Sequence, residues 1–463
     1  MWSRQPFLDT LCDLLAAGRQ AEVLKRLEEG VLDAASSSSE LNLQLASLCT
    51  LYAERGLEPA RLYLSQVQSA DARALQRPLF IALNAELAAL RGLLASPLKD
   101  ALDVAAQAND NLTLYHAAHA LLLAGDVKRS RDAALQISLE RLPKHLQWRS
   151  WSLRAELAER MGEGTNALKA YRLALKHAPE TDKPLIRFAL AESWLQLNRP
   201  DEALAVLGDD VPSTLEPAER VRGHYLIGVA QRQSGDAARA LPQLRLAEAL
   251  AAELGEHPPE LLQELARSQA ASGQLDAALA SYRTALAHTE DARRPYLQHE
   301  FTRLLRDLGQ LDEAETVLRD LLSQARYPHR AEASAELAEV SYFLGKFARV
   351  KPLAEYAIKG GVVGPACLAL GRVALEYFHL EEAEAWLEQA SGASSQGEPL
   401  WLSAQLLLAE TFAHKLDAQP ERLKQYAERA LVHLSPQDPW TVTLERYIEQ
   451  ADEVLASQKK IVN

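Results

Sequence analysis

The sequence is poor in the residues that interrupt or cross-link a chain. Glycine accounts for 21 of 463 residues, about 4.5% against a usual ~7%, and alanine and leucine dominate, a mixture that favours helix. There are three cysteines, Cys12, Cys49 and Cys367, far apart and without CxxC spacing. An odd, scattered set cannot form a complete disulfide framework, so we expect a reducing compartment, the cytoplasm.

Long apolar runs are also missing. Nowhere do 18 or more apolar residues follow one another without a charge, and the apolar stretch near the N-terminus contains Asp9 and Asp13. A signal peptide needs an uninterrupted apolar region and a membrane span needs about 20 apolar residues. We therefore expect no membrane association and interpret the first residues as the first helix of the fold.

Positive charge is in deficit. Fifty Lys and Arg residues face 63 Asp and Glu residues, which gives a formal net charge of −13 and a pI of about 5.5. Proteins that bind a nucleic-acid backbone present a basic field. The composition therefore argues against direct nucleic-acid binding by the molecule as a whole.

Recognisable catalytic motifs are absent as well. The sequence has no GxxxxGK[ST], no GxGxxG after a strand and no HExxH. Each cysteine lies in an apolar helical stretch, as an inert core residue would. His116 and His119 form an HxxH with no Cys, Asp or Glu close by in sequence, so we interpret them as a partly exposed structural pair. We expect no catalytic residue, no metal and no cofactor.

What the sequence does contain is a repeat. A helical stretch, a short turn with Gly or Asn, and an acidic, Ala-containing start of a second helix recur along the chain, as in RMGEGTNALKAY and AASGQLDAALASY. From the first to the last turn position the repeat covers 360 positions in ten intervals, a mean period of 36. The turn positions are Gly18, Gly56, Gly92, Gly125, Gly162, Asn198, Gly235, Gly273, Gly309, Gly345 and Phe378. A regular period of this length indicates a solenoid.

Within a period the apolar pattern is helical. In the unit at 258–291, Leu262, Leu265 and Ala266 share one helix face, and Ala278 and Tyr282 share a face of the next helix. Glycine suits the left-handed residue that ends the first helix, and the acidic residues after it favour the positive end of the second. One such hairpin exposes an apolar face, so the units must stack.

These spacings resemble the tetratricopeptide repeat (TPR) family. In the unit that begins at Trp148, the family positions 4, 8, 11, 15, 20, 24, 27 and 32 are occupied by Trp151, Ala155, Ala158, Gly162, Ala167, Tyr171, Ala174 and Pro179. Small residues at positions 8 and 20 let the two helices of a hairpin approach closely. The pairs Ala155 with Ala167 and Gly228 with Ala240 fit, whereas Thr302 and Val350 depart from the pattern.

The resemblance implies an all-α fold: a right-handed superhelical TPR or TPR-like α-solenoid of about 11–12 hairpins with a C-terminal capping helix. It is strongest from 148 to 390. We expect degenerate TPR-like hairpins at 1–145, a well-matched array at 146–398, a degenerate last hairpin at 399–437, and a capping helix with a tail at 438–463.

The resemblance also implies a groove, because in TPR superhelices the first helix of each unit lines the concave side. Carried over position by position, an Arg- and Tyr-rich set points into it: Arg222, Tyr225, Arg232, Arg267, Tyr296, His299, Arg303, Arg306, Tyr342 and Arg372. Such a surface could grip carboxylates bidentately. The alternative is a solvated face on which i,i+3 pairs, Glu264 with Arg267 and Glu300 with Arg303, neutralise each other.

Two function classes remain open. The first is a non-enzymatic scaffold that binds a protein or peptide, with an acidic or C-terminal carboxylate segment, through the concave groove. The second is a regulatory sensor that binds a small effector or signalling peptide and controls a separate effector protein, such as a transcriptional regulator; TPR-like arrays of some large bacterial regulators have similarly long periods. An enzyme is a distant third, because the sequence shows no convergent set of titratable residues.

Overall fold

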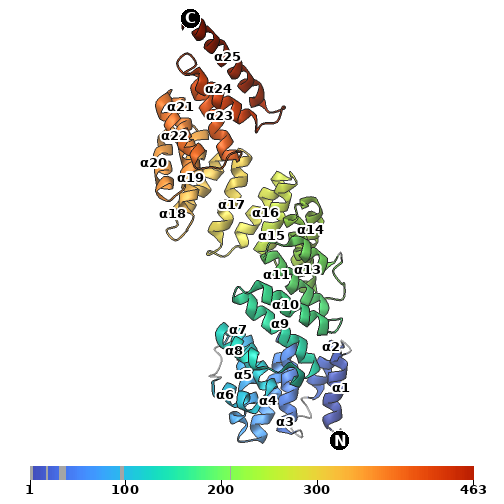
Figure 1. Cartoon of the computed structure of the whole chain (residues 1–463). Helices are drawn as coiled ribbons and strands as arrows, with labels where there is room; N and C mark the ends of the chain where they lie inside the picture. The colour runs from blue at the N-terminus through green and yellow to red at the C-terminus, as the bar shows by residue number, and fades with distance from the viewer. Residues whose placement is uncertain (1–3, 17–18, 31–37, 94–98, 209, 463) are drawn as a thin grey trace. The chain divides into compact units, whose positions relative to one another are not determined.

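The computed structural model describes residues 4–16, 19–30, 38–93, 99–208 and 210–462. Within these ranges the chain forms α-helices and short 3₁₀ helices, with no strand (Figure 1). The predicted all-α solenoid is confirmed. The chain divides into two compact units, Met1–Glu256 and His257–Asn463. This boundary lies inside the stretch 146–398 that the repeat pattern treats as one array, and the four-part division of the chain stays a prediction.

The first unit holds fourteen described α-helices. They are α1 (Arg4–Ala16), α2 (Gln20–Gly30), α3 (Ser39–Cys49), α4 (Ala53–Ala70), α5 (Pro78–Leu90), α6 (Lys99–Ala108), α7 (Asn111–Leu123), α8 (Val127–Gln136), α9 (Lys144–Arg160), α10 (Gly164–His177), α11 (Lys183–Gln196), α12 (Pro200–Leu207), α13 (Pro217–Gln233) and α14 (Ala237–Glu253). Three short 3₁₀ helices accompany them: η2 (Thr50–Tyr52), η3 (Ala74–Gln76) and η4 (Leu139–Arg141).

The second unit holds eleven described α-helices. They are α15 (Pro259–Ala271), α16 (Leu275–His288), α17 (Arg294–Asp307), α18 (Leu311–Ser323), α19 (Arg330–Phe343), α20 (Phe347–Lys359), α21 (Val363–Glu376), α22 (Leu380–Gly392), α23 (Pro399–Ala413), α24 (Pro420–Leu431) and α25 (Pro439–Val462). From α15 to α24 they pair consecutively into hairpins, and each hairpin packs on the next. The last helix, α25, buries Leu444 and Ala451 in the same core as α23 and α24.

The turn residues between paired helices have the left-handed conformation that the sequence predicts. Positive φ angles, from 56° to 89°, occur at Gly92, Gly125, Gly162, Asn198, Gly235, Gly273, Gly309, Gly345 and Phe378. Glycine adopts this conformation at little cost because it has no Cβ. These nine positions confirm the repeat register from α5 to α22.

The two earliest turn positions are not among these nine. Gly18 lies outside the described residues. The prediction for Gly56 is wrong: it lies inside α4, and a Cβ built there would stand 1.8 Å from the carbonyl oxygen of Cys49. Glycine at position 56 therefore lets the preceding chain pass close to α4, and it does not form a turn.

Small residues hold the paired helices together. Ala155 and Ala167, from α9 and α10, are both fully buried. At Gly228 of α13 a Cβ would come within 2.6 Å of Leu244 of α14. The predicted roles of positions 8 and 20 are thus confirmed, because any larger side chain would force the helices apart.

The first two helices, α1 and α2, contact residues that are distant from them in the sequence. Helix α1 packs against α9 as well as α2 and α3. Gln20 Nε2 donates a hydrogen bond of 2.6 Å to Asp182 Oδ1, 162 positions later. The start of the first unit therefore contacts α9 and the residue that caps α11, Asp182.

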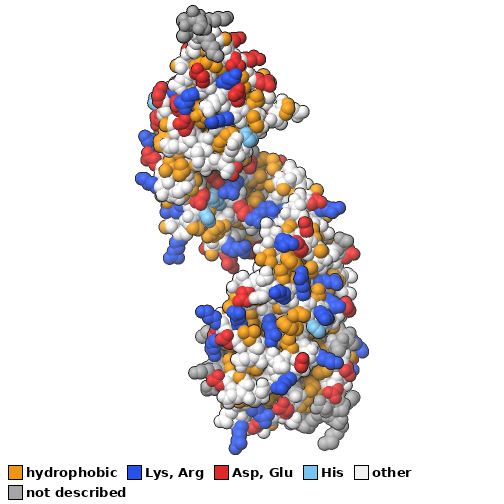
Figure 2. All heavy atoms as spheres, viewed as in Figure 1, with side chains coloured by type: hydrophobic (Ala, Val, Ile, Leu, Met, Phe, Trp, Pro, Cys, Tyr) orange, Lys and Arg blue, Asp and Glu red, His pale blue; other side chains and the backbone are white. Residues whose placement is uncertain are grey.

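No helix in the described part of the chain is long and apolar enough to cross a membrane. On the face that Figure 2 shows, basic and acidic side chains are interspersed over both units.

Candidate functional site

In the second unit the predicted groove residues lie on one side of the first helices, where they form a ladder of ion pairs between successive hairpins. Arg267 of α15 donates from Nε to Glu300 Oε2 of α17 at 3.0 Å and also pairs with Glu264 of its own helix. Arg303 of α17 donates to Glu336 of α19 at 3.0 Å. In both cross-hairpin pairs the partners are 33 positions apart, because stacking sets the same helix faces side by side.

The ladder continues to the fourth hairpin. Glu339 of α19 accepts from Arg306 of α17 at 3.2 Å and from Arg372 of α21 at 3.1 Å. The Tyr342 hydroxyl donates to Glu376 of α21 at 2.8 Å. We call the residues Arg267, Glu300, Arg303, Glu336, Arg306, Glu339 and Arg372 the charge ladder.

The charge ladder decides how much free positive charge this face presents. Burial disfavours the charge on Glu300, but hydrogen bonds from Arg267 and Gln263 outweigh it and lower the pKa of Glu300. Every arginine of the ladder thus already holds a carboxylate. Of the two local pairs expected from sequence, Glu264 with Arg267 forms, whereas Arg303 is bonded to Glu336 and Glu300 to Arg267.

His299 is a buried member of this face and not an open one. Its Nδ1 lies 2.5 Å from the Tyr327 hydroxyl and its Nε2 lies 3.1 Å from Glu336. Tyr296, on the same helix, is about half exposed and makes an edge contact with Tyr327. Burial and the neighbouring Glu336 carboxylate raise the pKa of Tyr327 to about 12.

The remaining predicted groove residues belong to the first unit. Arg222 of α13 forms a two-pronged pair with Glu192 of α11, at 2.8 and 2.6 Å. Tyr225 and Arg232 lie on the same helix and are partly buried. The ten residues predicted as one groove are therefore distributed over two units, and seven of them share the first-helix face of the second.

At its C-terminal end this face meets a cluster of exposed aromatic side chains. The exposed fractions of Phe343, Tyr377 and Phe378 are 51%, 56% and 68%. Ring contacts of 5.3 to 5.9 Å link Phe343, Tyr342, Phe347 and Tyr377. Phe378 follows Tyr377 directly in the chain, and its ring contacts that of His414 at 5.4 Å. The Arg372 guanidinium lies 5.2 Å from the Phe343 ring centre. We call Tyr342, Phe343, Phe347, Tyr377 and Phe378 the aromatic edge.

Sequence reasoning missed most of the aromatic edge. It predicted Tyr342 and Arg372 as binding residues but treated Phe378 as a turn position alone. The sequence did contain an indication that Phe378 is special, because this residue occupies a turn position at which the other repeats have Gly or Asn. A phenylalanine with a φ of 56° is sterically costly, and such costs concentrate at functional sites.

A cavity of about 640 Å³ lies on the first-helix face of the first unit. Helices α5, α7, α9, α11 and α13 all contribute to its wall. Its polar lining includes Glu86, His119, Arg149, Glu159 and Glu192. Glu159 accepts hydrogen bonds from the Tyr171 and Ser193 hydroxyls, and burial raises its pKa.

The two histidines of the HxxH motif both bond to one carboxylate, which comes from another hairpin. Glu86 of α5 bonds His116 Nδ1 and His119 Nδ1, each at 2.6 Å, and His116 Nε2 bonds the Ser47 hydroxyl at 2.6 Å. His116 is fully buried, so the expectation of a partly exposed pair is wrong for it, although the structural role fits. Burial opposes ionisation of Glu86, but His116 and His119 outweigh it and lower the pKa of Glu86 to about 2.

The described parts of the chain show little that would support metal binding or catalysis by a cysteine thiol. No group of three or more His, Cys, Asp or Glu residues there could hold a metal ion. The three cysteines are free thiols, and burial raises the pKa of each, which disfavours the nucleophilic thiolate.

Comparison with known proteins gives structural similarities alone. No family model matches the sequence, and no curated protein matches it. The apo form of the quorum sensor NprR from B. thuringiensis is 15% identical, with a TM-score of 0.47 over 66% of this chain and 97% of that one. A tetratricopeptide repeat protein from Parabacteroides merdae is 16% identical, with a TM-score of 0.40 over 56% and 98%. PilF of Pseudomonas aeruginosa is 18% identical, with a TM-score of 0.39 over 50% and 98%.

These similarities concern the fold and carry nothing about activity. The fold itself rests on the coordinates: paired helices, left-handed turn residues at a regular period, and small residues where the two helices of a hairpin meet. The chain is a TPR-like α-solenoid.

Proposed function

We propose that this chain is a non-enzymatic scaffold that binds a protein or peptide through the first-helix face of its second unit, with the aromatic edge as the anchor. The observation that carries the proposal is the exposure of three aromatic side chains, Phe343, Tyr377 and Phe378, with Arg372 packed against the ring of Phe343. Aromatic residues and arginine dominate the energetics of protein interfaces. Contiguous exposed apolar surface on a protein commonly marks a binding site.

The backbone at Phe378 supports the same conclusion. Its left-handed conformation costs about 1 kcal/mol relative to glycine. Contacts of the side chain offset little of that cost, since 68% of it is exposed and, among the described residues, its ring contacts that of His414 alone, at 5.4 Å. A ligand that covers Phe378 would account for the residue.

The charge ladder supports a proposal about the chemistry of the partner. A carboxylate of the partner can bind Arg306 or Arg372 by sharing or displacing Glu339, which already bridges them. This fits a partner with an acidic or C-terminal carboxylate segment next to an apolar residue. The arrangement favours a selective polar contact beside an apolar anchor over general attraction of negative charge.

Quantitative affinity capture from the native cell tests the proposal, with the wild-type chain and the variants Phe343→Ala and Phe378→Gly as baits. We expect a partner recovered by the wild type to be lost, or reduced about tenfold, with both variants. Phe378→Gly should meanwhile raise the free energy of unfolding by about 1 kcal/mol, because it relieves the backbone cost.

If Phe378→Gly loses the partner while its free energy of unfolding rises, the loss results from weaker binding and not from unfolding of the variant. The matched control is Val442→Ala, which removes part of an apolar side chain that is 70% exposed on α25, outside the aromatic edge. If the variants at Phe343 and Phe378 recover every partner as well as the wild type does, the proposal is wrong.

The cavity of the first unit favours a second candidate, a sensor that binds a small effector or signalling peptide. Its volume falls in the range of small-molecule sites, and it combines aromatic walls with many charged and polar groups. Among the described residues, the Trp148 indole nitrogen and the Ser152 hydroxyl have no hydrogen-bond partner, although both line the cavity. Unmet donors of this kind suit a ligand with acceptor atoms.

A thermal-shift screen of the full chain against amino acids and short peptides tests this candidate. A ligand bound at a hundred times its Kd should stabilise the folded state by about 2.7 kcal/mol. The variant Ala189→Phe, which fills the cavity wall, should abolish the shift, whereas Tyr377→Ala should not. A shift that survives Ala189→Phe would place the ligand elsewhere.

A further inference from the structure

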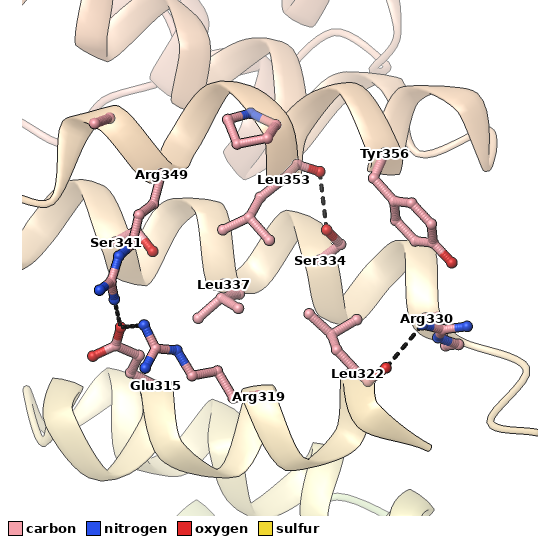
Figure 3. Close-up of a pocket in the computed structure, with 12 residues that line it drawn as sticks. Glu315, Arg319, Leu322, Arg330, Ser334, Leu337, Ser341, Arg349, Leu353 and Tyr356 are labelled. Carbon is pink, nitrogen blue, oxygen red and sulfur yellow. Dashed lines mark hydrogen bonds and ion pairs between the residues drawn. The ribbon is translucent and has the colours of Figure 1, made fainter. Parts of the chain in front are cut away.

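The second unit has another cavity on a different face, bounded by second helices. It has a volume of about 570 Å³ and lies between α18 and α20, with α19 as its floor (Figure 3). Both flanking helices pack on α19. Figure 3 shows Leu322, Leu337 and Leu353, one from each helix, pointing toward one another in the middle of the cavity. We call this cavity the outer trough.

One end of the outer trough carries surplus positive charge. The Glu315 carboxylate, with only 8% of its side chain exposed, forms ion pairs with Arg319 at 2.7 Å, Arg349 at 2.7 Å and Lys346 at 2.5 Å. Three cations share one carboxylate here, whereas at most two arginines share one in the charge ladder, at Glu339. Arg319 and Arg349 remain about half exposed.

The opposite end carries a second arginine site. Arg330 of α19 donates to the Leu322 carbonyl at 2.8 Å and lies 5.8 Å from the centre of the Tyr356 ring. Among the described residues, no acidic side chain forms a hydrogen bond or ion pair with Arg330. The trough is therefore apolar in the middle and positive at both ends.

A polar group at the floor adds an independent indication. The Ser341 hydroxyl is fully buried and lines the trough beneath Arg349, yet no described residue makes a hydrogen bond with it. A buried hydroxyl without a partner is rare in folded proteins and suggests an acceptor supplied from outside.

The backbone of the trough walls indicates which kind of peptide can bind in the outer trough. The walls are helices whose N–H and C=O groups are already bonded within the helix, so the trough cannot pair with an extended strand. An occupant that brings its own backbone hydrogen bonds is a helix, and an amphipathic helix places residues at i, i+3, i+4 and i+7 on one apolar face. Positive charge at both ends requires carboxylates beside that face.

We propose that the outer trough binds an acidic amphipathic helix of another protein. Its apolar face would lie on Leu322, Leu337 and Leu353, and its carboxylates would meet Arg319 and Arg349 at one end and Arg330 at the other. This surface is formed by second helices and the floor of α19, so the proposal does not depend on the aromatic edge.

The test uses a fluorescein-labelled peptide of about 14 residues, a helix of about 20 Å, with leucines on one face and glutamates elsewhere. A twin peptide carries lysine in place of every glutamate. Fluorescence anisotropy with the full chain should give saturable binding of the acidic peptide and at least tenfold weaker binding of its twin. Equal binding of the two peptides, or no binding of the acidic one, would overturn the proposal.

Variants then locate the binding. Ala348→Trp adds a large side chain at an exposed position of the trough wall and should abolish binding, and Arg319→Gln should weaken it about fivefold. The matched control is Arg283→Gln on α16, since Arg283, like Arg319, is about half exposed, lies on a second helix and pairs with one carboxylate, Glu313. Circular dichroism checks that each variant is folded.

The remaining outcomes are decisive as well. Binding that Arg283→Gln weakens as much as Arg319→Gln does would show nonspecific attraction and overturn the proposal. Saturable binding of decanoate that Ala348→Trp abolishes, without binding of the acidic peptide, would assign the trough to a small amphiphile instead. Tyr377→Ala should leave peptide binding unchanged, which separates this test from that of the aromatic edge.

Discussion

Arg267 of α15 and Glu300 of α17 are joined by an ion pair that crosses from one hairpin to the next, 33 positions along the chain. Each side chain is about one-third exposed. The pair therefore contributes both to the stacking of hairpins and to the charge of the first-helix face. Its energy can be measured separately from the apolar packing beneath it.

We expect a double-mutant cycle with Arg267→Ala and Glu300→Ala to give a coupling energy of about 1 kcal/mol, since the pair is partly desolvated and two-pronged. The free energy of unfolding is measured by urea denaturation at low and high salt. The same cycle on Lys25 and Glu29, which are well exposed and 3.9 Å apart, should give a coupling near zero. Equal coupling for the two pairs would contradict the role of the ladder.

The seam within a hairpin should not tolerate enlargement. Ala278 and Ala167 are fully buried, so Ala278→Leu or Ala167→Leu should lower the free energy of unfolding by ~1–3 kcal/mol through overpacking. Glu445→Ala, on the exposed side of α25, should be nearly neutral. Similar unfolding midpoints for all three variants would show that the assigned seam is not close-packed.

Two helical glycines should respond in opposite directions to the same substitution. Gly56→Ala places a Cβ against the Cys49 carbonyl and should destabilise the first unit by about 2 kcal/mol. Gly392 of α22 has open space around it and a negative φ, so Gly392→Ala should stabilise the second unit by roughly 0.5 kcal/mol. Calorimetry of both variants checks this, and a stabilising Gly56→Ala would mean that α4 is placed wrongly.

The Glu86–His119 pair should make the first unit dependent on pH. Burial opposes the charge on His119, but its hydrogen bond and attraction to Glu86 raise its pKa above 6.5. Its contribution to stability is therefore complete below pH 6.5 and is lost as the pH rises through the raised pKa. The contribution of Glu86, with a pKa near 2, is present above pH 4.5 and is lost as the pH falls toward 2.

The stability difference between the wild type and His119→Gln should accordingly be largest between about pH 4.5 and 6.5 and shrink above that range. Urea denaturation at a series of pH values measures it. Glu86→Ala, which leaves two histidines without their carboxylate, should cost about 3–5 kcal/mol. A difference between wild type and His119→Gln that does not vary with pH would show that His119 is not charged in this pair.

Much of the fold could be predicted because it depends on local geometry. A turn between two antiparallel helices needs a left-handed residue, so Gly162 and Asn198 could be identified from sequence alone. The failure at Gly56 has the same origin. A glycine is required both where φ is positive and where another backbone passes close by, and the sequence does not distinguish these two needs.

The candidate site was less predictable because its members come from different hairpins. Sequence spacing offered Glu300 a neighbour three positions away, Arg303, but stacking brought Arg267 to it instead. His116 and His119 seemed to lack an acidic neighbour, and Glu86 reached them from another hairpin. Cross-hairpin partners depend on the rotation and offset of one helix against the next, which small differences in packing determine.

The sequence by itself determined the repeat, the helical hairpins and the small residues at their seams, since period, turn chemistry and side-chain volume act within about 36 residues. The tertiary structure alone decided which charges neutralise each other, that Phe378 and its neighbours stand exposed, and that Gln20 meets Asp182. The reason is physical: local conformation follows from steric limits on each residue, whereas charge pairing and exposure depend on which surfaces the stacked helices bring together.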